Sequence, residues 1–587
     1  MVKRIFLFTL FWVCSVNMAL AENQDQSLYR LLDEIWQYEL SVSPMMASRE
    51  GLSEANDKLA DISPSARKAE YEHWLDFKEK LNAFDATVLS DEAYISLLMQ
   101  HYRLDNYISG YRFNDHLVPI TSEYGFHVGM ASLPRAVNFR DVKDYTDYLA
   151  RLKALPAYFE QQISYMREGL ETGFTQPKVV MQGFEDSVLP YIKEAATDSP
   201  FYAPFKTFPE HIDEPTRQKL QRQAQAVVEQ SVTPAYQAFY DFLVNDYIPG
   251  ARTSIAAKDW PDGEAYYRDR VKHYTTTDMT PEEIHALGKA EVARIRAEMQ
   301  EIVDKLEFDG TIDEFIHFLR TDPQFYADSA EALLKEASFI AKKMDAKLPS
   351  LFEFLPRTPY GVAPVPDSIA PKYTTGRYVG PSRDDEPGYY WVNTYALDKR
   401  PLYALPALTL HEAVPGHHLQ ISLAAELEDL PKVRQNTYIS AFGEGWGLYS
   451  EFLGIEAGIY EDEYDHFGRL SYEMWRACRL VVDTGMHMFG WSRDQALDYM
   501  LTNTALSEHN VRTEIDRYIS WPAQALSYKI GEIKIKALRK QAESELGKDF
   551  DVRKFHRAVL EHGSVPLFIL EKQVNRYIQT TQEARQQ

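Results

Sequence analysis

The spacing of apolar residues along the chain predicts that most of it is helical. A capping box at 280–283, with proline at the first helical position, precedes apolar residues at helical spacing as far as Leu306. A second box at 311–314 opens another helix, and the stretch 216–243 is amphipathic in the same way. We therefore expect a mostly α fold.

A different pattern interrupts the helices between residues 356 and 387. Seven prolines in this segment exclude a regular helix. The stretch 388–394 that follows is rich in aromatic and β-branched residues and is typical of a strand. We expect its backbone to bind an extended peptide by strand pairing, with Tyr390 and Asn393 as substrate contacts, a buried strand being the alternative.

The first residues are typical of a secretory signal peptide. Lys3 and Arg4 precede the apolar stretch 5–16, and an Ala-Leu-Ala cleavage motif ends at Ala21. The apolar stretch is shorter than the roughly 20 residues of a membrane span, so cleavage is expected, an uncleaved anchor being the alternative. Cys14 lacks the neighbouring small residue of a lipoprotein signal, so we expect no lipid anchor.

Removal of 21 of the 587 residues leaves 566, which exceeds one ordinary core and predicts at least two lobes. We expect 1–21 as signal peptide, 22–355 as an N-terminal helical lobe, 356–404 as a proline-rich crossing with a substrate-edge strand, and 405–587 as a C-terminal catalytic helical lobe. Cys478 would be the only cysteine left, so stability must come from core burial and not from an intramolecular disulfide.

The negative net charge of the chain disfavours two classes of binding partner. The net charge is −24, or −26 without Lys3 and Arg4, which disfavours nucleic acid and anionic membranes. We expect a protein secreted across the inner membrane to the periplasm, with no stable membrane insertion after cleavage. Nothing in the sequence indicates its oligomeric state.

A group of histidines in the C-terminal part has the composition of a metal site. His411 and Glu412 begin a motif in which the next histidines, His417 and His418, are six and seven positions on. Zinc motifs on one helix use H-E-x-x-H, because residues i and i+4 share a face. At about 100° per residue, a histidine six positions on faces away, and one seven positions on lies roughly 10 Å along the axis. Proline and glycine at 415–416 can break the helix, and a two-residue bulge would bring His417 to the ligand position, with His418 as the alternative.

An acidic third ligand is available about 30 residues later. Glu444 lies between glycines in the segment 443–447, and Glu451 follows on the same helix face. Three glycines in five positions weaken a helix by roughly 1 kcal/mol each, so they predict close approach of another backbone. We expect Glu444 to bind the metal and Glu451 to orient a ligand histidine. The alternative is that these are ordinary polar residues at a helix end and on a solvated face.

The segments 411–420 and 443–451 resemble the signature of the domain-of-unknown-function 885 family of bacterial zinc-peptidase-like proteins. The resemblance runs from the helix at 280 to near the C-terminus and includes 483–487 and 517–525. More distantly, the chain is similar to thimet oligopeptidase, angiotensin-converting enzyme and Taq-type carboxypeptidases. These resemblances imply a helical clamshell with a zincin-like metallopeptidase fold and a small β-sheet beside the active-site cleft. The inserted Pro-Gly departs from H-E-x-x-H, although dipeptidyl peptidase III, with H-E-x-x-G-H, tolerates an insertion.

Together, motif and resemblance predict one zinc ion per chain and a general base. The expected ligands are His411, His417 and Glu444, with Glu412 as the base. The resemblance implies an oxyanion donor on a late helix, and an arginine could bind a substrate carboxylate. The candidates for these functions are Tyr518, Tyr528, His487 and Arg517.

The expected function is an exported zinc metallopeptidase acting on short peptides, with a carboxypeptidase as one form of it. One alternative is a zinc-dependent amide or ester hydrolase on non-peptide substrates. Another is a non-catalytic binding protein that keeps a structural metal. The presence of Glu412 argues against the last, because a structural site needs no base.

Overall fold

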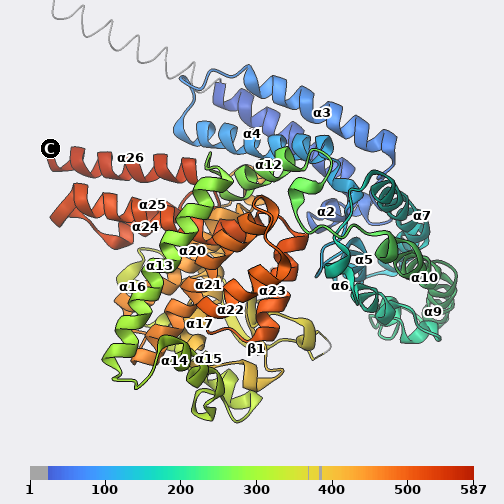
Figure 1. Ribbon diagram of the computed structural model, residues 1–587. Helices are drawn as coiled ribbons and strands as arrows, with labels where there is room; N and C mark the ends of the chain where they lie inside the picture. The colour runs from blue at the N-terminus through green and yellow to red at the C-terminus, as the bar shows by residue number, and fades with distance from the viewer. Residues whose placement is uncertain (1–23, 368, 382–385, 587) are drawn as a thin grey trace, which may run out of the picture. The chain divides into compact units, whose positions relative to one another are not determined.

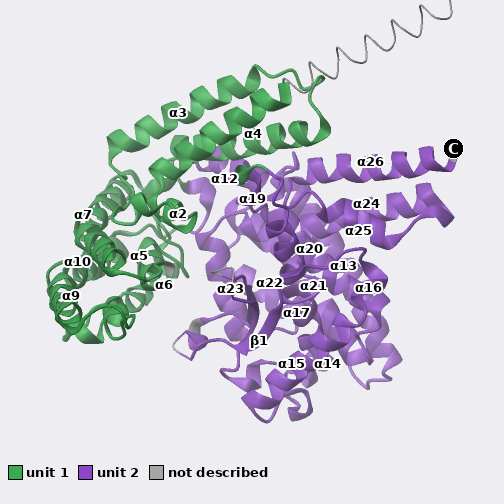
Figure 2. Cartoon of the chain, turned by 180° about the vertical axis from the view of Figure 1, so that it is seen from behind, with its two compact units in different colours: residues 1–254, 260–262, 431–433 green, residues 255–259, 263–430, 434–587 purple. Residues whose placement is uncertain are grey.

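The computed structural model describes residues 24–586 apart from 368 and 382–385 (Figure 1). The predicted signal peptide therefore lies outside the described residues. The chain forms two compact units (Figure 2). The first runs to Ser254 and includes 260–262 and 431–433, and the second holds the other residues from Ile255 on. The described part is mostly helical with a three-stranded sheet, which confirms the predicted mostly α class.

The first unit consists of helices, short turns and 3-10 segments. Its opening helix, 24–42, packs on the next two long helices around a core that includes Leu32 and Trp36. The predicted amphipathic stretch forms two helices joined by a π turn at Val228–Val232. The numbered helices are α2 (Pro44–Arg49), α3 (Pro64–Asn82), α4 (Asp91–Arg112), α5 (Phe126–Ala131), α6 (Leu133–Ala136), α7 (Val142–Thr172), α8 (Lys178–Met181), α9 (Glu214–Val227), α10 (Thr233–Phe242) and α11 (Ile248–Gly250).

The second unit holds the remaining helices and the sheet. The short helix α19 (Lys432–Gln435) is divided: residues 432–433 are assigned to the first unit, and the rest of the helix to the second. The other helices are α12 (Gly263–Thr275), α13 (Pro281–Lys305), α14 (Ile312–Thr321), α15 (Ala330–Asp345), α16 (Leu348–Leu351), α17 (Leu405–Glu412), α18 (His417–Ala425), α20 (Ser440–Ala457), α21 (Glu463–His487), α22 (Arg493–Asn503), α23 (Glu508–Ser520), α24 (Ser527–Leu546), α25 (Val552–Leu560) and α26 (Leu567–Gln586).

Both predicted capping boxes open helices. At the start of α13, the Thr280 hydroxyl accepts from the Glu283 amide at 3.2 Å, and the Glu283 carboxylate accepts from the Thr280 amide at 2.9 Å. Thr311 and Glu314 repeat this arrangement at the start of α14. These two helix starts are confirmed, because reciprocal bonds satisfy amide groups that have no partner within the helix.

The boundary between the units lies before α12, whereas the sequence analysis placed the lobe boundary after residue 355. The reason is the packing of α13 along α21. At Gly288 on α13 the two helices are so close that a Cβ would lie 2.7 Å from the Leu480 Cβ. Apolar periodicity shows that α13 has a buried face but does not show which helix covers it.

The sheet contains β1 (Tyr360–Pro364), β2 (Gly376–Val379) and β3 (Gly388–Val392) in the order β1-β3-β2. The predicted strand exists as β3, but it is the middle strand, parallel to β1 and antiparallel to β2. Tyr390 is fully buried and pairs with a residue on each side. The prediction of a substrate-edge strand at β3 is therefore wrong, because its backbone groups are already paired. Among the described strands, β2 has β3 as its single partner and is an edge.

No helix in the described part of the chain combines the length and apolar character that a membrane crossing requires.

Candidate metal centre

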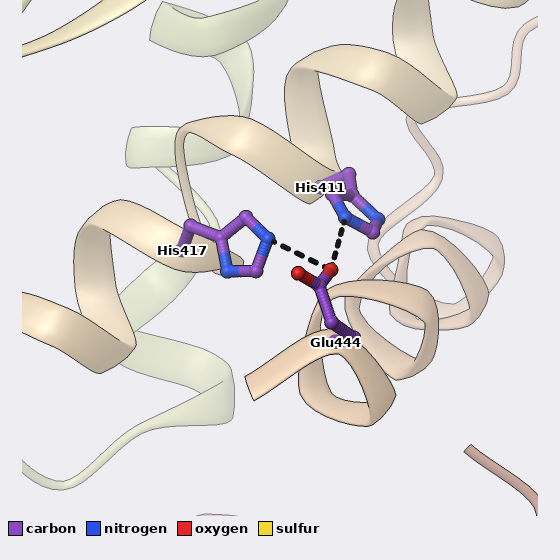
Figure 3. Close-up of side chains that lie close together, drawn as sticks. All are labelled: His411, His417 and Glu444. Carbon is purple, nitrogen blue, oxygen red and sulfur yellow. Dashed lines mark ion pairs between the residues drawn. The ribbon is translucent and has the colours of Figure 1, made fainter. Parts of the chain in front are cut away.

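Three helices of the second unit bring together two histidines and a glutamate (Figure 3). His411 lies near the end of α17, His417 begins α18, and Glu444 lies in the first part of α20. The Oε2 atom of Glu444 is 3.6 Å from Nε2 of His411 and 3.3 Å from Nε2 of His417. One ligand atom from each residue lies within 4.8 Å of the others.

The break between α17 and α18 places His417 in this group. At Gly416 a Cβ would lie 1.9 Å from the carbonyl oxygen of His411, so the chain can turn this tightly only with glycine. The buried indole of Trp446 donates to the carbonyl of Pro415 at 2.7 Å and holds the turn against α20. The helix break that was predicted at 415–416 is confirmed, and it separates α17 from α18 completely where a two-residue bulge was expected.

The glycines of α20 make room for close neighbours. A Cβ on Gly445 would lie 2.5 Å from Cα of Gly531 on α24, which confirms the expected approach of another backbone. A Cβ on Gly447 would lie 2.6 Å from Cε1 of His411, so this glycine makes room for a ligand ring. The weak helix propensity of this segment is thus offset by packing that only glycine permits.

Glu451 orients His411. Its Oε1 atom is 2.8 Å from Nδ1 of His411, which leaves Nε2 directed toward Glu444. Arg476 lies 3.5 Å from the same Glu451 oxygen. Burial opposes a charge on His411, but the carboxylates of Glu444 and Glu451 raise its pKa to about 9. Burial also opposes the charge on Glu444, yet the neighbouring His417 and His411 hold its pKa well below the ordinary value.

Glu412 connects this group to the sheet. Its Oε2 atom accepts a hydrogen bond from the backbone amide of Tyr378 on β2 at 2.8 Å, and its side chain is buried. The adjacent Arg377 is exposed, lies over the ring of Tyr373 at 5.6 Å, and interacts electrostatically with Glu412. No sequence pattern singled out Arg377, because its proximity depends on how β2 lies against α17.

Tyr438 is a second neighbour that the sequence analysis missed. Its hydroxyl donates to Oε1 of Glu444 at 3.3 Å, while the side chain as a whole is 50 % exposed. The ring lies where a side chain on Gly443 would be, since a Cβ there would be 2.3 Å from the hydroxyl oxygen. Burial of the hydroxyl and the charge of Glu444 raise the pKa of Tyr438 above its ordinary value. The phenol therefore remains a proton donor, and Gly443 was the only signal for it in the sequence.

Two of the predicted histidines lie elsewhere. His418 faces β2, where its Nδ1 atom is 3.1 Å from the Tyr378 hydroxyl, and burial lowers its pKa to about 4. His487 is fully buried, with Nδ1 accepting from the Ala257 amide at 3.1 Å and Nε2 donating to the Tyr518 carbonyl at 3.0 Å. Neither belongs to the His-His-Glu group, so the structure favours His417 over His418 and gives His487 a place in the scaffold.

The remaining late-helix candidates form a hydrogen-bonded network. The Tyr518 hydroxyl donates to Glu514 at 2.6 Å and accepts from Arg479 at 2.6 Å. Arg517 donates to Glu514 at 3.1 Å and to the Tyr528 hydroxyl at 3.4 Å. Tyr518 is buried in this network, and Tyr528 remains half-buried.

The predicted substrate contacts on and after β3 are scaffold groups. The Tyr390 hydroxyl is buried 3.4 Å from that of Thr409 on α17. The amide nitrogen of Asn393 donates to the carbonyls of Ala370, Tyr373 and Thr374. Asn393 thus fixes the loop that leads into β2.

The group fits a divalent cation by two criteria. Two imidazole nitrogens and one carboxylate oxygen are a donor set that zinc prefers, and ligands about 2.0–2.1 Å from a tetrahedral centre are about 3.4 Å apart. The Oε2 atom of Glu444 lies 3.3 Å from Nε2 of His417 and 3.6 Å from Nε2 of His411. The carboxylates of Glu412, Glu444 and Glu451 also concentrate negative charge in a mostly buried space, which a cation would balance.

Comparison with known proteins identifies the family. Residues 44–574 match the family described as bacterial protein of unknown function (DUF885). A candidate lipoprotein from Colwellia psychrerythraea shares 30% identity with the chain, covering 95% of this chain and 99% of its own, with a TM-score of 0.86. A candidate lipoprotein of unknown function from Shewanella oneidensis shares the fold at 18% identity, covering 93% and 99%, with a TM-score of 0.74. No curated protein matches the chain. The chain therefore belongs to the DUF885 family of bacterial proteins of unknown function.

Proposed function

We propose that this protein is a zinc-dependent peptidase of zincin-like fold that hydrolyses short peptides. The observation that carries the proposal is the group of His411, His417 and Glu444, with Glu412 directly beside it and Glu451 behind it. A structural zinc has four closed protein ligands, whereas a catalytic one has three and an adjacent base. Here three candidate ligands lie beside a proposed base, which is the composition of a catalytic site.

The chemistry divides between the metal and the protein. Zinc would lower the pKa of a water molecule and polarise the peptide carbonyl. Glu412 takes a proton from the attacking water and passes it to the leaving amine. The Tyr378 amide holds one oxygen of Glu412 at 2.8 Å, which fixes the orientation of the carboxylate and leaves its other oxygen for the proton.

Tyr438 and Arg377 are two donors beside the proposed reacting groups. The phenol of Tyr438 lies at Glu444, and the guanidinium of Arg377 interacts electrostatically with Glu412. Both can donate to an oxyanion, and we assign this function first to Tyr438 because its hydroxyl contacts a ligand residue. Of the two edge strands, β1 and β2, it is β2 that contacts Glu412, and it replaces β3 as our candidate for pairing with an extended substrate.

We also propose that the protein is exported to the periplasm. The first 21 residues have the order of a signal peptide, and the relative from Colwellia psychrerythraea is described as a candidate lipoprotein.

A peptide library incubated with the zinc-loaded and the chelator-treated protein tests the proposed function. We expect cleavage that chelator abolishes and zinc restores, and a loss of at least 100-fold in Glu412→Gln, consistent with the usual contribution of a general base. Glu428→Gln, at a surface glutamate outside the site, is the matched control and should cleave at the parent rate.

The peptidase proposal would be refuted by an absence of zinc-dependent cleavage or by unchanged turnover in Glu412→Gln. Ester and non-peptide amide panels separate a different hydrolase from a peptidase, because the same residues would act on those bonds. Metal analysis of His411→Ala is the test of the ligand set, and retained stoichiometric zinc would count against it.

A further inference from the structure

A second feature of the same unit is a pocket of about 210 Å³ beside α17. A single ordered water needs only about 15 Å³, so the pocket can hold a side chain or a small organic ion. Its lining includes Leu408 of α17, Tyr403 just before that helix, Tyr472 of α21, Arg320 of α14 and Arg400.

The two arginines lack counter-ions among the described residues. Arg320 donates through Nη2 to the carbonyls of Thr504 and Leu501, and its buried Nε has no hydrogen-bond partner there. Arg400 donates through Nε to the Tyr395 carbonyl at 3.3 Å. Buried or half-buried guanidinium groups are ordinarily paired with an anion, because burial without one is costly.

The acidic groups at the pocket are already engaged. Asp398 pairs with Lys399 at 2.8 Å, and Glu508 pairs with Arg512 at 2.6 Å. Neither forms an ion pair with Arg400 in the described structure, although Asp398 is near enough for their charges to interact. The pocket therefore retains positive charge.

A buried phenol adds an unused donor. Tyr403 is 4 % exposed, and its hydroxyl has no hydrogen-bond partner among the described residues. Buried polar groups nearly always have partners, so this hydroxyl is available to a bound molecule or an ordered water. With two guanidinium groups and this phenol, the donors match a carboxylate, which accepts several hydrogen bonds.

The pocket is adjacent to the proposed catalytic glutamate. Leu408 and Glu412 are four residues apart on α17, about 6 Å along the helix. Thr375, which also lines the pocket, is three residues from Tyr378 on the strand that holds Glu412, about 10 Å along an extended chain. Two or three residues of an extended peptide would span this distance.

We propose that this pocket is a substrate subsite that binds a peptide carboxylate within about three residues of the cleaved bond. The proposal rests on the proposed peptidase function. The carboxylate is either the free C-terminus of the peptide, which would make the enzyme a carboxypeptidase, or an acidic side chain. Arg320, Arg400 and Tyr403 form the subsite, in place of Arg517, whose guanidinium already bonds to Glu514.

Binding of four tripeptides to the full chain carrying Glu412→Gln tests the subsite without turnover. The probes are Ala-Ala-Ala, its C-terminal amide, Ala-Glu-Ala-amide and Ala-Gln-Ala-amide, measured by calorimetry. We expect one charged peptide to bind at least tenfold more tightly than its uncharged match. A preference for Ala-Ala-Ala over its amide assigns the C-terminus, and a preference for glutamate over glutamine assigns a side chain.

Added Arg400→Gln should remove this preference. Added Tyr403→Phe should weaken it without lowering the thermal stability, since the hydroxyl has no described partner to lose. Arg357→Gln, at an exposed arginine paired with Glu426, is the control and should keep it. Equal binding of charged and uncharged peptides, or a preference that survives Arg400→Gln, overturns the subsite. Charged-peptide preference in a protein that cleaves no peptide would overturn the peptidase function and leave the binding pocket standing.

Discussion

Gly447 on α20 offers a test of how the chain holds its first histidine ligand. A Cβ at this position would lie 2.6 Å from Cε1 and 2.8 Å from Nε2 of His411, closer than real Cβ contacts. The ring has no free space to turn into, because it is buried and its Nδ1 atom is 2.8 Å from Glu451. Gly447→Ala should therefore displace a ligand without changing the chemistry of any ligand.

The magnitude has two parts. Ordinary contact begins near 3.4 Å, so a ring atom now 2.6 Å from the new methyl must move by about 0.8 Å. Metal–ligand distances hold within about 0.2 Å, so zinc affinity should fall by about 10- to 100-fold, as when a supporting residue is lost. The substitution should raise the free energy of unfolding by about 1 kcal/mol through helix propensity and lower it by about 1–3 kcal/mol through overpacking. The net loss is about 0–2 kcal/mol.

The assay is zinc affinity by competition with a chelator, together with urea unfolding of the metal-free protein. Gly110→Ala is the matched control, because a Cβ on this α4 glycine would lie 3.2 Å from the end of the Asp115 side chain, whereas a Cβ on Gly447 would lie 2.6 Å from the buried His411 ring. The control should keep its zinc affinity and gain up to about 1 kcal/mol. If Gly447→Ala binds zinc as tightly as the parent and also becomes more stable, the close approach to His411 is refuted.

Three further predictions concern buried charged groups of the second unit. Glu451→Gln should weaken zinc binding by about 10- to 100-fold, although it leaves all three proposed ligands in place. The same chelator competition measures this affinity, and an affinity equal to that of the parent would contradict the orienting contact with His411. Lys529→Met should lower the free energy of unfolding by about 3–5 kcal/mol, because it removes the cation shared by the buried Glu473 and Glu532 and the half-buried Glu291, and an unchanged urea midpoint would show that other cations compensate. Burial raises the pKa of Asp483 to about 7, so its contribution to stability is present below about pH 4 and is lost as pH rises through about 7, a change of about 4 kcal/mol. Parent and Asp483→Asn unfolding curves at pH 4.5 and 7.5 should differ in pH dependence by most of this amount, and parallel curves would contradict the shift.

The sequence contained the local features of this fold because they depend on neighbouring residues. The capping box at Thr280 needs only a threonine and a glutamate three positions apart, and it forms as expected. The glycines of α20 likewise predicted close packing, which occurs at Gly445 against Gly531. Which element approaches each glycine could not be deduced, since it depends on contacts between segments far apart in the chain.

The same distinction explains the differences at the candidate site. His411 and Glu444 are candidates because of residue type and spacing, but the location of His417 depends on a turn of four residues between two helices. The strand β3 was evident from its composition, whereas its central place in the sheet depends on where β1 and β2 pair. Arg377 reaches the site through tertiary packing, without a periodic or motif signal, whereas Tyr438 lies six residues before Glu444 and had Gly443 as its only signal in the sequence.

The arrangement of α20 explains why so many weak helix formers surround the proposed ligand Glu444. One glycine admits the Tyr438 ring, the next admits the α24 backbone, and the third admits the His411 ring. Together the three glycines cost about 3 kcal/mol in helix propensity. Larger residues would remove this cost, but their side chains would exclude the three neighbours. The helix is therefore held by its packing and not by its own propensity, so its geometry depends on α24 and on the turn at Pro415. A site built in this way fixes Glu444 and Glu451 on one rigid element, which is the arrangement that a ligand and its orienting partner require.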